Sequence, residues 1–433
     1  MEPSCSPGAQ PRLGNRLITC LSAFAALAVA CLASATVASA GISLSEAERL
    51  ALARDAALES LAAERQSLRE ASVAAGQLPD PRMRVGTINV PTDSFSLDAE
   101  DMTMLEVGVS QMFPAGDTRQ LSARRNELEA ASVEARIRDR RRVVIRELRF
   151  AWIDHAYLQA ARGLVEDQID WLDPLVANVV TRYGHGQLQQ LDVVTTTLEQ
   201  VTLRERLLDL QLQIAEADTG LTRWLDAPTG QLATAIPAPQ EWPALAVLES
   251  KLEAHPTQVD FDRRIDVAEA DVALERQRYR PEWELDLAYG FRGGRGMGGE
   301  SRSDMASAMV SFSLPLFSGK RQDRTVAAAR AAARSLHAMH VDHQRELRAE
   351  LAAAFAVARA AREIEALYEA RLLALGEQAS RSAIAAYANN AAEFTALIET
   401  GTALLELKLG RIEAAARRAR ADTTLAYLAG EAP

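Results

Sequence analysis

Two kinds of hydrophobic spacing alternate along the chain, and they predict two kinds of element. Apolar residues recur at helical spacing in six segments, at 44–78, 117–182, 189–226, 244–279, 320–386 and 393–429. They recur at every second position in four shorter segments, at about 82–90, 105–113, 282–292 and 306–317. The sequence therefore predicts the order helix, strand, strand, long helix, helix twice over.

The strand segments are apolar on one face only. Their apolar residues alternate with polar, charged or small ones, as in Trp283-Glu284-Leu285-Asp286. This alternation over about ten residues is typical of outer-membrane barrel strands, which separate lipid from a wet lumen. A soluble sheet with one side on a core is the alternative. The positions that we expect on the membrane strands are Leu105, Val107, Val109, Trp283, Leu285, Leu287, Tyr289, Phe291, Val310, Phe312, Leu314 and Leu316.

Four strands are too few to close a barrel. An open edge in lipid leaves backbone N–H and C=O groups without partners, at a cost of several kcal/mol each. Because the smallest membrane barrels have about eight strands, copies of the chain must pool their strands. Two copies would close a narrow barrel and three would give a twelve-stranded pore, with ring symmetry as the natural arrangement.

An internal duplication with a period of about 200 residues relates the two halves of the chain. The segment VGVSQMFPAGDTRQ at Val107–Gln120 corresponds to VSFSLPLFSGKRQD at Val310–Asp323, and further matches surround Tyr183 and Tyr387. Several prolines separate the copies. We therefore divide the chain into a leader at 1–40, a first repeat at 41–226, a Pro-rich linker at 227–243 and a second repeat at 244–433.

The helical segments are long and carry coiled-coil seams. Residues 117–182 as one helix would extend roughly 100 Å, far more than a globular domain needs. Pro174 should bend that helix or mark a seam. Apolar residues spaced alternately by three and four form a seam at Leu203, Leu207, Leu210, Ile214, Ala217 and Leu221, with a sparser copy at Ile398, Leu405, Leu409 and Ile412. We expect the shorter helices to stack end to end beside the long ones.

Residues 1–40 have the pattern of a secretory signal. Two arginines and the apolar run Leu17–Val37 precede the small residues Ala38–Ala40; a membrane-spanning anchor is the alternative. The three cysteines, Cys5, Cys20 and Cys31, all lie in this segment, so cleavage leaves no thiol for disulfides or metal binding. A weak lipoprotein-box pattern leaves open whether Cys31 is lipidated.

Composition excludes other function classes. Lys and Arg total 48 against 59 Asp and Glu, a formal net charge of −11, which argues against nucleic acid as a partner. After the leader, no apolar run reaches the length of about 18 residues that a transmembrane helix needs. No nucleophile triad, paired carboxylates or zinc-ligand spacing is present, so we expect neither enzymatic activity nor a cofactor.

The duplicated strand-to-helix corners FPAGDTRQ and LPLFSGKRQDR, the motif YGHGQLQQLDVV and the element order together resemble the TolC-like outer-membrane factor family. The resemblance implies a mainly helical fold in which three copies build a twelve-stranded outer-membrane barrel and a coiled-coil helical tunnel in the periplasm. It implies passive efflux, with a periplasmic membrane-fusion adaptor and an inner-membrane RND-type pump as partners. The corner LPLFSGKRQDR is closest to the heavy-metal (Cus/Czc-type) branch. Drug efflux, type I secretion and a soluble periplasmic coiled-coil adaptor are the alternatives.

The resemblance also places a periplasmic entrance at the two helix–helix turns. Tyr387 matches a family tyrosine whose hydrogen bonds help to hold that entrance closed. Asp192 and Glu399 fall where the family places acids, and rings of them would favour cations; a solvated helix face is the alternative. We expect positive φ at Gly184 and Gly186, because a sharp reversal needs it. The complete set is Tyr183, Gly184, His185, Gly186, Asp192, Tyr387, Asn389, Asn390 and Glu399.

Four further patterns favour ordinary structural roles over binding. The spacing of an HxxHxxH pattern brings neighbouring pairs of histidines within reach of one metal ion. We interpret these histidines instead as polar residues on an exposed helix face. Methionines near the strands would suit soft metal ions, yet they more commonly fill loop or lipid-facing positions. The segment Gly293–Gly299 lacks the ending of a phosphate-binding loop, so we expect a plain loop between two strands. In the arginine-rich stretch, we expect acidic residues on adjacent helices to neutralise the charge. The residues are His337, His340 and His343; Met102, Met104, Met297, Met305 and Met309; Arg136, Arg138 and Arg140–Arg142.

Overall fold

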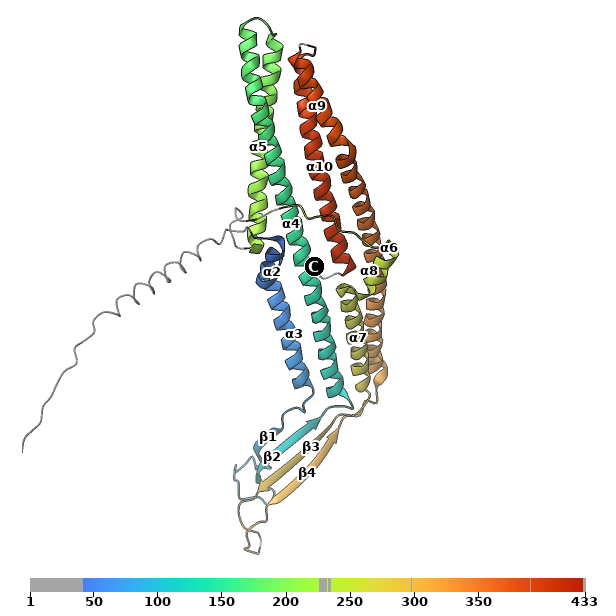
Figure 1. Cartoon of the computed structure of the whole chain (residues 1–433). Coiled ribbons are helices and arrows are strands. Elements are labelled where there is room, and N and C mark those ends of the chain that lie inside the picture. The colour runs from blue at the N-terminus through green and yellow to red at the C-terminus, as the bar shows by residue number, and fades with distance from the viewer. Residues whose placement is uncertain (1–41, 226–231, 233–234, 297, 390, 431–433) are drawn as a thin grey trace, which may run out of the picture.

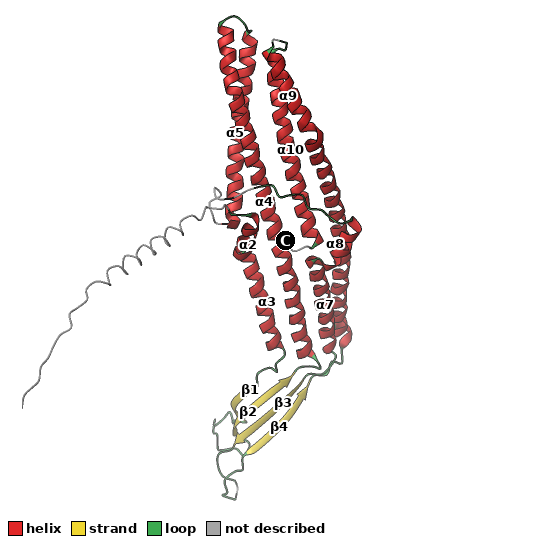
Figure 2. Cartoon of the chain, in the orientation of Figure 1, coloured by secondary structure: helices red, strands yellow, loops and turns green. Residues whose placement is uncertain are grey.

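A computed structural model describes residues 42–225, 232, 235–296, 298–389 and 391–430. The leader with its cysteines, most of 226–234, Met297 and Asn390 lie outside these ranges. In the described part, long helices lie side by side and a small sheet extends from one end of them (Figures 1 and 2). The two helix–helix turns lie at the opposite end.

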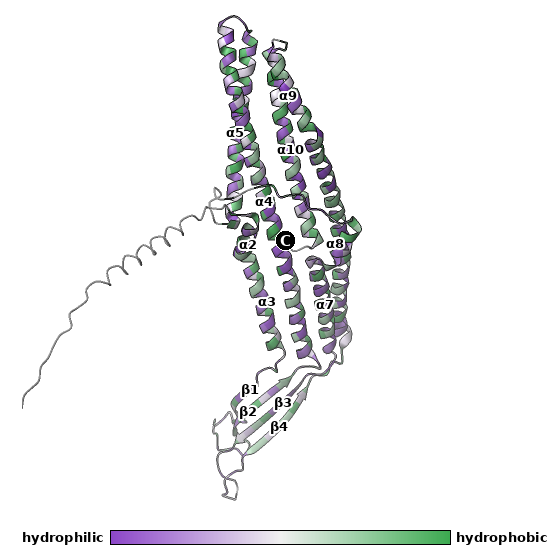
Figure 3. Ribbon diagram, in the orientation of Figure 1, coloured by the Kyte–Doolittle hydropathy of each residue, from purple (hydrophilic) through white to green (hydrophobic). Residues whose placement is uncertain are grey.

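The chain runs through the sequence helix, strands, long helix, helix twice. The first pass consists of α2 (Leu44–Arg54), α3 (Ala56–Ala75), β1 (Arg82–Ile88), β2 (Met104–Phe113), α4 (Thr118–Gly184) and α5 (Gln190–Leu225). The second consists of α6 (Leu245–Lys251), α7 (Pro256–Gln277), β3 (Trp283–Phe291), β4 (Met305–Phe312), α8 (Gln322–Leu367), α9 (Leu373–Ala388) and α10 (Phe394–Ala429). No described helix combines the length and apolar character needed to cross a membrane, and hydrophilic positions recur along the helices in Figure 3.

Two helices that the sequence predicted as continuous are interrupted. The segment 44–78 breaks at Asp55, whose carboxylate accepts the Leu58 backbone N–H at 2.9 Å and so caps α3, which ends early at Ala75. The segment 244–279 breaks at His255, because Pro256 has no N–H to donate and favours an extended residue before it. Both predictions of a single helix were therefore wrong.

A third interruption is milder and lies in the long helix of the second half. α8 passes into α9 through a π-helical turn at Tyr368–Leu372. The Tyr368 ring lies against Gly410 of α10, where an added Cβ would be 2.3 Å from the phenolic oxygen. Its counterpart α4 is helical throughout its 67 residues, and it continues through Pro174.

The short helices stack end to end beside the long ones, as predicted (Figure 1). At one junction, Arg54 of α2 donates a 3.0 Å hydrogen bond to the Leu225 carbonyl at the end of α5. At the other, Arg142 of α4 donates a 2.9 Å hydrogen bond to the carbonyl of Gly430, directly after α10. Cations at these positions compensate the unpaired carbonyls of the helix ends.

Both predicted coiled-coil seams pack into the core. Leu203, Leu210 and Ile214 of α5 are buried with Leu405 and Leu409 of α10, and all pack on α4. Leu207, Ala217, Ile398 and Ile412 are partly buried against the same cluster, and Leu221 belongs to the neighbouring cluster around Trp152. The alternating spacing of three and four identified the helix faces that bury apolar surface.

The four strands form one antiparallel sheet in the order β1-β2-β3-β4. β1 and β4 are its two edges. β4 ends at Phe312, so the prediction that Leu314 and Leu316 belong to the strand was wrong. Pro315 lies between them and lacks the N–H that a further ladder hydrogen bond requires.

Candidate functional site

One face of the sheet is apolar and exposed. The register aligns Val85, Val107, Tyr289 and Ala306 in one row across the four strands, so the alternating residues of all strands share a face. On this face Leu287 is 52% exposed and Phe312 is 61% exposed. Of the predicted strand residues, Leu105, Val109, Trp283, Leu287, Tyr289, Phe291, Val310 and Phe312 are exposed and Val107 and Leu285 are partly covered.

The opposite face of the sheet carries charged, hydroxyl and small residues, together with Met104, Met112, Met305 and Met309. Arg84 of β1 forms ion pairs with Glu106 of β2, at 2.9 Å, and with Asp286 of β3, at 3.1 Å. Gly108 and Ala288 lie between these charged residues. The sheet therefore separates an apolar surface from a polar one, as the period-two pattern predicted.

An arginine that the sequence did not single out joins the two loops at the far end of the sheet. Arg302 donates hydrogen bonds to the carbonyls of Asp98, Glu100 and Gly293 and forms a 2.7 Å ion pair with Asp101. Its side chain is only 10% exposed. The glycine-rich segment 293–299 connects β3 to β4 in this loop, which agrees with the predicted loop role.

The two helix–helix turns lie near each other at the end opposite the sheet (Figure 1). Arg182 of α4 donates a 2.5 Å hydrogen bond to the hydroxyl of Tyr387 of α9. The Tyr387 ring meets Phe394 of α10 edge to face, with centroids 5.5 Å apart. Phe394 is buried with Val179 and Leu397. Both hairpins therefore meet in a small apolar cluster closed by one polar contact.

The first turn reverses direction at Gly186, which has φ +73° as predicted. The same prediction for Gly184 was wrong, because Gly184 is the last residue of α4 and its φ is not positive. His185 follows as the C-cap of α4. In the second turn, Asn389 caps α9 and its side chain donates a 2.8 Å hydrogen bond to the Ala385 carbonyl; Asn390 is outside the described residues.

The two predicted entrance acids have different surroundings. The Asp192 carboxylate accepts the backbone N–H of Gln189 at 2.9 Å, which stabilises the start of α5. Glu399 is exposed on α10. Tyr183, which corresponds to Tyr387 in the first turn, is 45% exposed. The contact from Arg182 to Tyr387 was not predicted.

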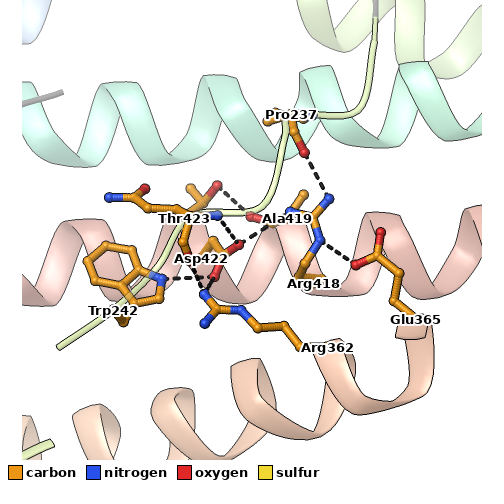
Figure 4. Close-up of polar contacts among 9 residues, drawn as sticks. Pro237, Trp242, Arg362, Glu365, Arg418, Ala419, Asp422 and Thr423 are labelled. Atoms are coloured by element: carbon orange, nitrogen blue, oxygen red, sulfur yellow. Dashed lines mark hydrogen bonds and ion pairs between the residues drawn. The ribbon is translucent and has the colours of Figure 1, made fainter. Parts of the chain in front are cut away.

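A buried ionic cluster holds the linker between the two halves against the helices (Figure 4). Arg418 of α10, 2% exposed, forms a 2.6 Å ion pair with Glu365 of α8 and donates a hydrogen bond to the Pro237 carbonyl. Asp422 accepts hydrogen bonds of 2.8 Å each from Arg362 of α8 and from the Trp242 indole. These contacts therefore attach the linker to α8 and α10.

The histidines of the HxxHxxH pattern have separate partners. The imidazole of His340 is 2.6 Å from the Gln258 side-chain oxygen, and that of His343 is 2.9 Å from the Thr257 hydroxyl. His337 is exposed and lies 3.8 Å from Glu269. Across the described ranges, no group of three or more His, Cys, Asp or Glu side chains is placed to hold a metal ion. Met102 lies in the loop between β1 and β2, as predicted, whereas Met104, Met305 and Met309 lie on the polar face of the sheet, so the prediction of a loop or lipid-facing position was wrong for these three.

Acidic side chains do neutralise part of the arginine-rich stretch of α4, as predicted. Arg136 forms a 3.0 Å ion pair with Glu64, and Arg140 a 2.7 Å ion pair with Asp55, both on α3 or at its start. The hydrogen bond from Arg140 holds the pKa of the Asp55 carboxyl below its usual value. Opposite charges therefore hold the N-terminal end of α3 against α4.

No protein-family model matches the chain, and no curated protein matches it in sequence. In three dimensions it is similar to solved membrane channels. CusC, described as forming a transmembrane channel, is 14% identical over 90% of this chain and 92% of its own, with a TM-score of 0.75.

Two further structures agree. The outer-membrane protein VceC from Vibrio cholerae is 17% identical over 89% of this chain and 96% of its own, with a TM-score of 0.73. The outer-membrane channel MtrE from Neisseria gonorrhoeae is 13% identical over 90% and 89%, also at 0.73. The chain therefore has the fold of these three proteins, which is mainly helical with a small four-stranded sheet, as predicted.

Proposed function

We propose that the protein is a TolC-like outer-membrane factor that acts as the passive exit duct of a tripartite efflux system. An inner-membrane RND-type pump and a periplasmic adaptor would deliver the substrate, and the duct itself would carry out no chemistry. The sheet lies in the outer membrane and the helices in the periplasm. The observation that carries the proposal is a four-stranded sheet with one exposed apolar face and two open edges.

The open edges argue for a ring of copies. In lipid, every backbone N–H and C=O of a sheet must be paired, including those at its two edges. The edge strand β4 of one copy must therefore pair with the edge strand β1 of the next. Three copies give twelve strands, which leave room for a water-filled lumen lined by the polar face. A homotrimer is the proposed assembly.

The helices support the same ring. α5 and the α8–α9 segment lie at opposite edges of the helical layer (Figure 1), and each exposes apolar side chains. On α5 these residues follow coiled-coil spacing: Leu191, Val194, Leu198, Val201, Leu208 and Leu212. On α8 and α9 they are Val357, Ile364, Leu367, Leu375 and Ile384. A ring that joins β4 to β1 also brings these two surfaces together.

The proposal also covers domains, export and gating. The leader at 1–40 would direct export, and the repeats at 41–226 and 244–433 would each supply two strands and one helical hairpin. The linker at 227–243 would fasten the repeats together from one side. The turns around Tyr183 and Tyr387 would form the periplasmic entrance, with Asp192 and Glu399 near it.

We propose heavy-metal cations as the cargo, and the support is the resemblance of the LPLFSGKRQDR corner to the heavy-metal branch. Deleting the gene and challenging cells with copper, silver, zinc, cobalt and cadmium tests this. Increased sensitivity to one of these ions supports the cargo. Unchanged metal tolerance with increased drug sensitivity, or with lost protein secretion, assigns the duct to one of the alternative cargoes.

Disulfide trapping tests the ring directly. Val85→Cys on β1 and Val310→Cys on β4, in the chain without its leader cysteines, should give covalent dimers and trimers in outer-membrane fractions. Neighbouring register pairs should be tried as well. Val107→Cys with Tyr289→Cys is the matched control, because these positions face each other within one sheet and should cross-link within one copy. A monomer released in soluble form by osmotic shock contradicts the proposal and favours the adaptor alternative.

A further inference from the structure

Arg84 spans three strands on the polar face of the sheet. Its guanidinium is 2.9 Å from Oε1 of Glu106 on β2 and 3.1 Å from Oδ1 of Asp286 on β3. A second hydrogen bond joins its Nε to the same Glu106 oxygen at 3.2 Å. The Glu106 and Asp286 side chains are 12% and 15% exposed, while that of Arg84 is 54% exposed. One arginine therefore covers two carboxylates and presents its own charge to the surroundings.

Small residues make this reach across the sheet possible. The register places Gly108 directly beside Arg84, followed by Ala288 and Ser307 on the next two strands. A Cβ at Gly108 would lie 3.4 Å from Nη2 of Arg84 and 3.2 Å from the Ala288 Cβ. The strip of small residues lets the guanidinium lie low over β2, between its two partners.

The charges of this group do not cancel. Two carboxylates and one guanidinium leave this group one negative charge in each copy. Arg82 of β1 and Glu284 of β3 lie on the same face by register and offset each other, so removing Arg84 would leave two net negative charges and uncover both acids. In a lumen with low-dielectric walls, fixed charges at one height bias which ions enter.

We propose that Arg84 sets the ion selectivity of the membrane part of the pore, by limiting how strongly Glu106 and Asp286 attract cations. The inference rests on the proposed function, in which this polar face lines the lumen and the group recurs around the ring.

Reversal potentials in planar bilayers under a KCl gradient test the proposal with the full-length trimeric channel. Arg84→Gln should raise the ratio of K⁺ to Cl⁻ permeability several-fold. The change should shrink at high salt, since the Debye length falls from about 10 Å at 0.1 M to about 3 Å at 1 M. Arg84→Gln with Glu106→Gln restores one negative charge and should return the ratio toward that of the wild type.

Arg84→Lys separates selectivity from bracing of the sheet. Lysine keeps the charge but loses the forked donor geometry, so selectivity should stay near the wild-type value even if the trimer becomes less heat-stable. Conductance with unchanged ion preference in Arg84→Gln overturns this inference and leaves the proposed function standing. Failure of the purified wild-type protein to form an oligomer that inserts into bilayers overturns the proposed function and this inference with it.

Discussion

Arg182, in the last turn of α4, donates a 2.5 Å hydrogen bond to the hydroxyl of Tyr387, in the last turn of α9. The guanidinium carbon also lies 5.7 Å from the centre of the Tyr387 ring. The two residues are 205 positions apart in the chain and belong to different hairpins. In the proposed duct, this contact fastens one hairpin to the other at the entrance.

Tyr387→Phe should loosen the entrance. The change removes the hydroxyl that accepts the Arg182 hydrogen bond but keeps the ring against Phe394, so the local fold should persist. A hydrogen bond to a charged group contributes about 1.5–3 kcal/mol, enough to shift a closed entrance toward open states. Single-channel recordings should show higher mean conductance or longer open times.

The counterpart tyrosine supplies the control for this experiment. Tyr183 lies in the corresponding turn of the first half and is 45% exposed. Tyr183→Phe should leave conductance near the wild-type level. Equal effects of the two substitutions would argue against a specific latch between Arg182 and Tyr387.

The sheet was largely predictable from the sequence because its two faces have different surroundings. A strand such as Trp283–Phe291 must alternate apolar with polar or small residues, and this period is visible without any partner. The end of β4 was misplaced because the alternation continues through Leu314 and Leu316, although Pro315 stops the ladder. Pro315 was a local sign that the strand ends there, but the prediction followed the alternation instead.

The helix breaks and the entrance contact were less predictable because distant partners decide them. Asp55 interrupts a helical pattern and pairs with Arg140, 85 residues away. The π turn at Tyr368 faces Gly410 on another helix. Nothing local to Arg182 indicates its pairing with Tyr387. Pro256, by contrast, was a local signal for the break at His255.

Gly116→Ala should destabilise the corner between β2 and α4. Gly116 has φ +52°, and an added Cβ would lie 2.4 Å from the Gln277 side-chain oxygen and 2.5 Å from Cδ of Arg280. The left-handed backbone alone costs a residue with a Cβ about 1–2 kcal/mol. Displacing Gln277 also disturbs its hydrogen bond with the Asp117 backbone, so the thermal midpoint of the purified protein should fall.

The same substitution at the second corner serves as the control. Gly319 corresponds to Gly116 in the sequence repeat, and an added Cβ there meets no atom within 4 Å. Its φ is not positive, so Gly319→Ala should leave the thermal midpoint nearly unchanged. Equal losses at both corners would contradict the role assigned to the Gly116 conformation.

Arg418→Met should weaken the attachment of the linker to the helices. The change leaves Glu365, with a side chain 13% exposed, without its cation, while Asp422 keeps its ion pair with Arg362. Breaking one partner of a buried ion pair costs about 3–5 kcal/mol. Thermal unfolding should shift down strongly, and limited proteolysis should cut sooner near Pro237, whose carbonyl loses its Arg418 donor.

The adjacent arginine is a matched control for this prediction. Arg417 is 55% exposed and pairs with Glu413 one turn away on the same helix. Such surface pairs contribute about 0.3–0.5 kcal/mol. Arg417→Met should therefore have little effect on either measurement, and comparable losses from both variants would refute the special role of the buried cluster.

His255 occupies a buried junction between α10 and α7. It is fully buried, its Nδ1 lies 2.8 Å from the Thr257 hydroxyl, and its ring meets Tyr427 at 5.1 Å between centroids. Burial, together with the positive charges of Arg142 and Arg146 and nearby His343, lowers the pKa of His255 to about 4. The folded protein therefore favours the neutral imidazole.

This lowered pKa makes the protein sensitive to acid through His255. Unfolded histidine has a pKa near 6.5, so between about pH 6.5 and pH 4 the unfolded chain binds a proton that the folded chain does not. The contribution of His255 to stability is complete above pH 6.5 and declines as the pH falls to 4, by about 3 kcal/mol. His255→Asn keeps an acceptor for the start of α7 but cannot titrate, so the thermal midpoint should depend less on pH in this window.

His337→Asn, at an exposed position on α8, should retain the wild-type pH profile. An unchanged acid dependence in His255→Asn would show that other groups control it.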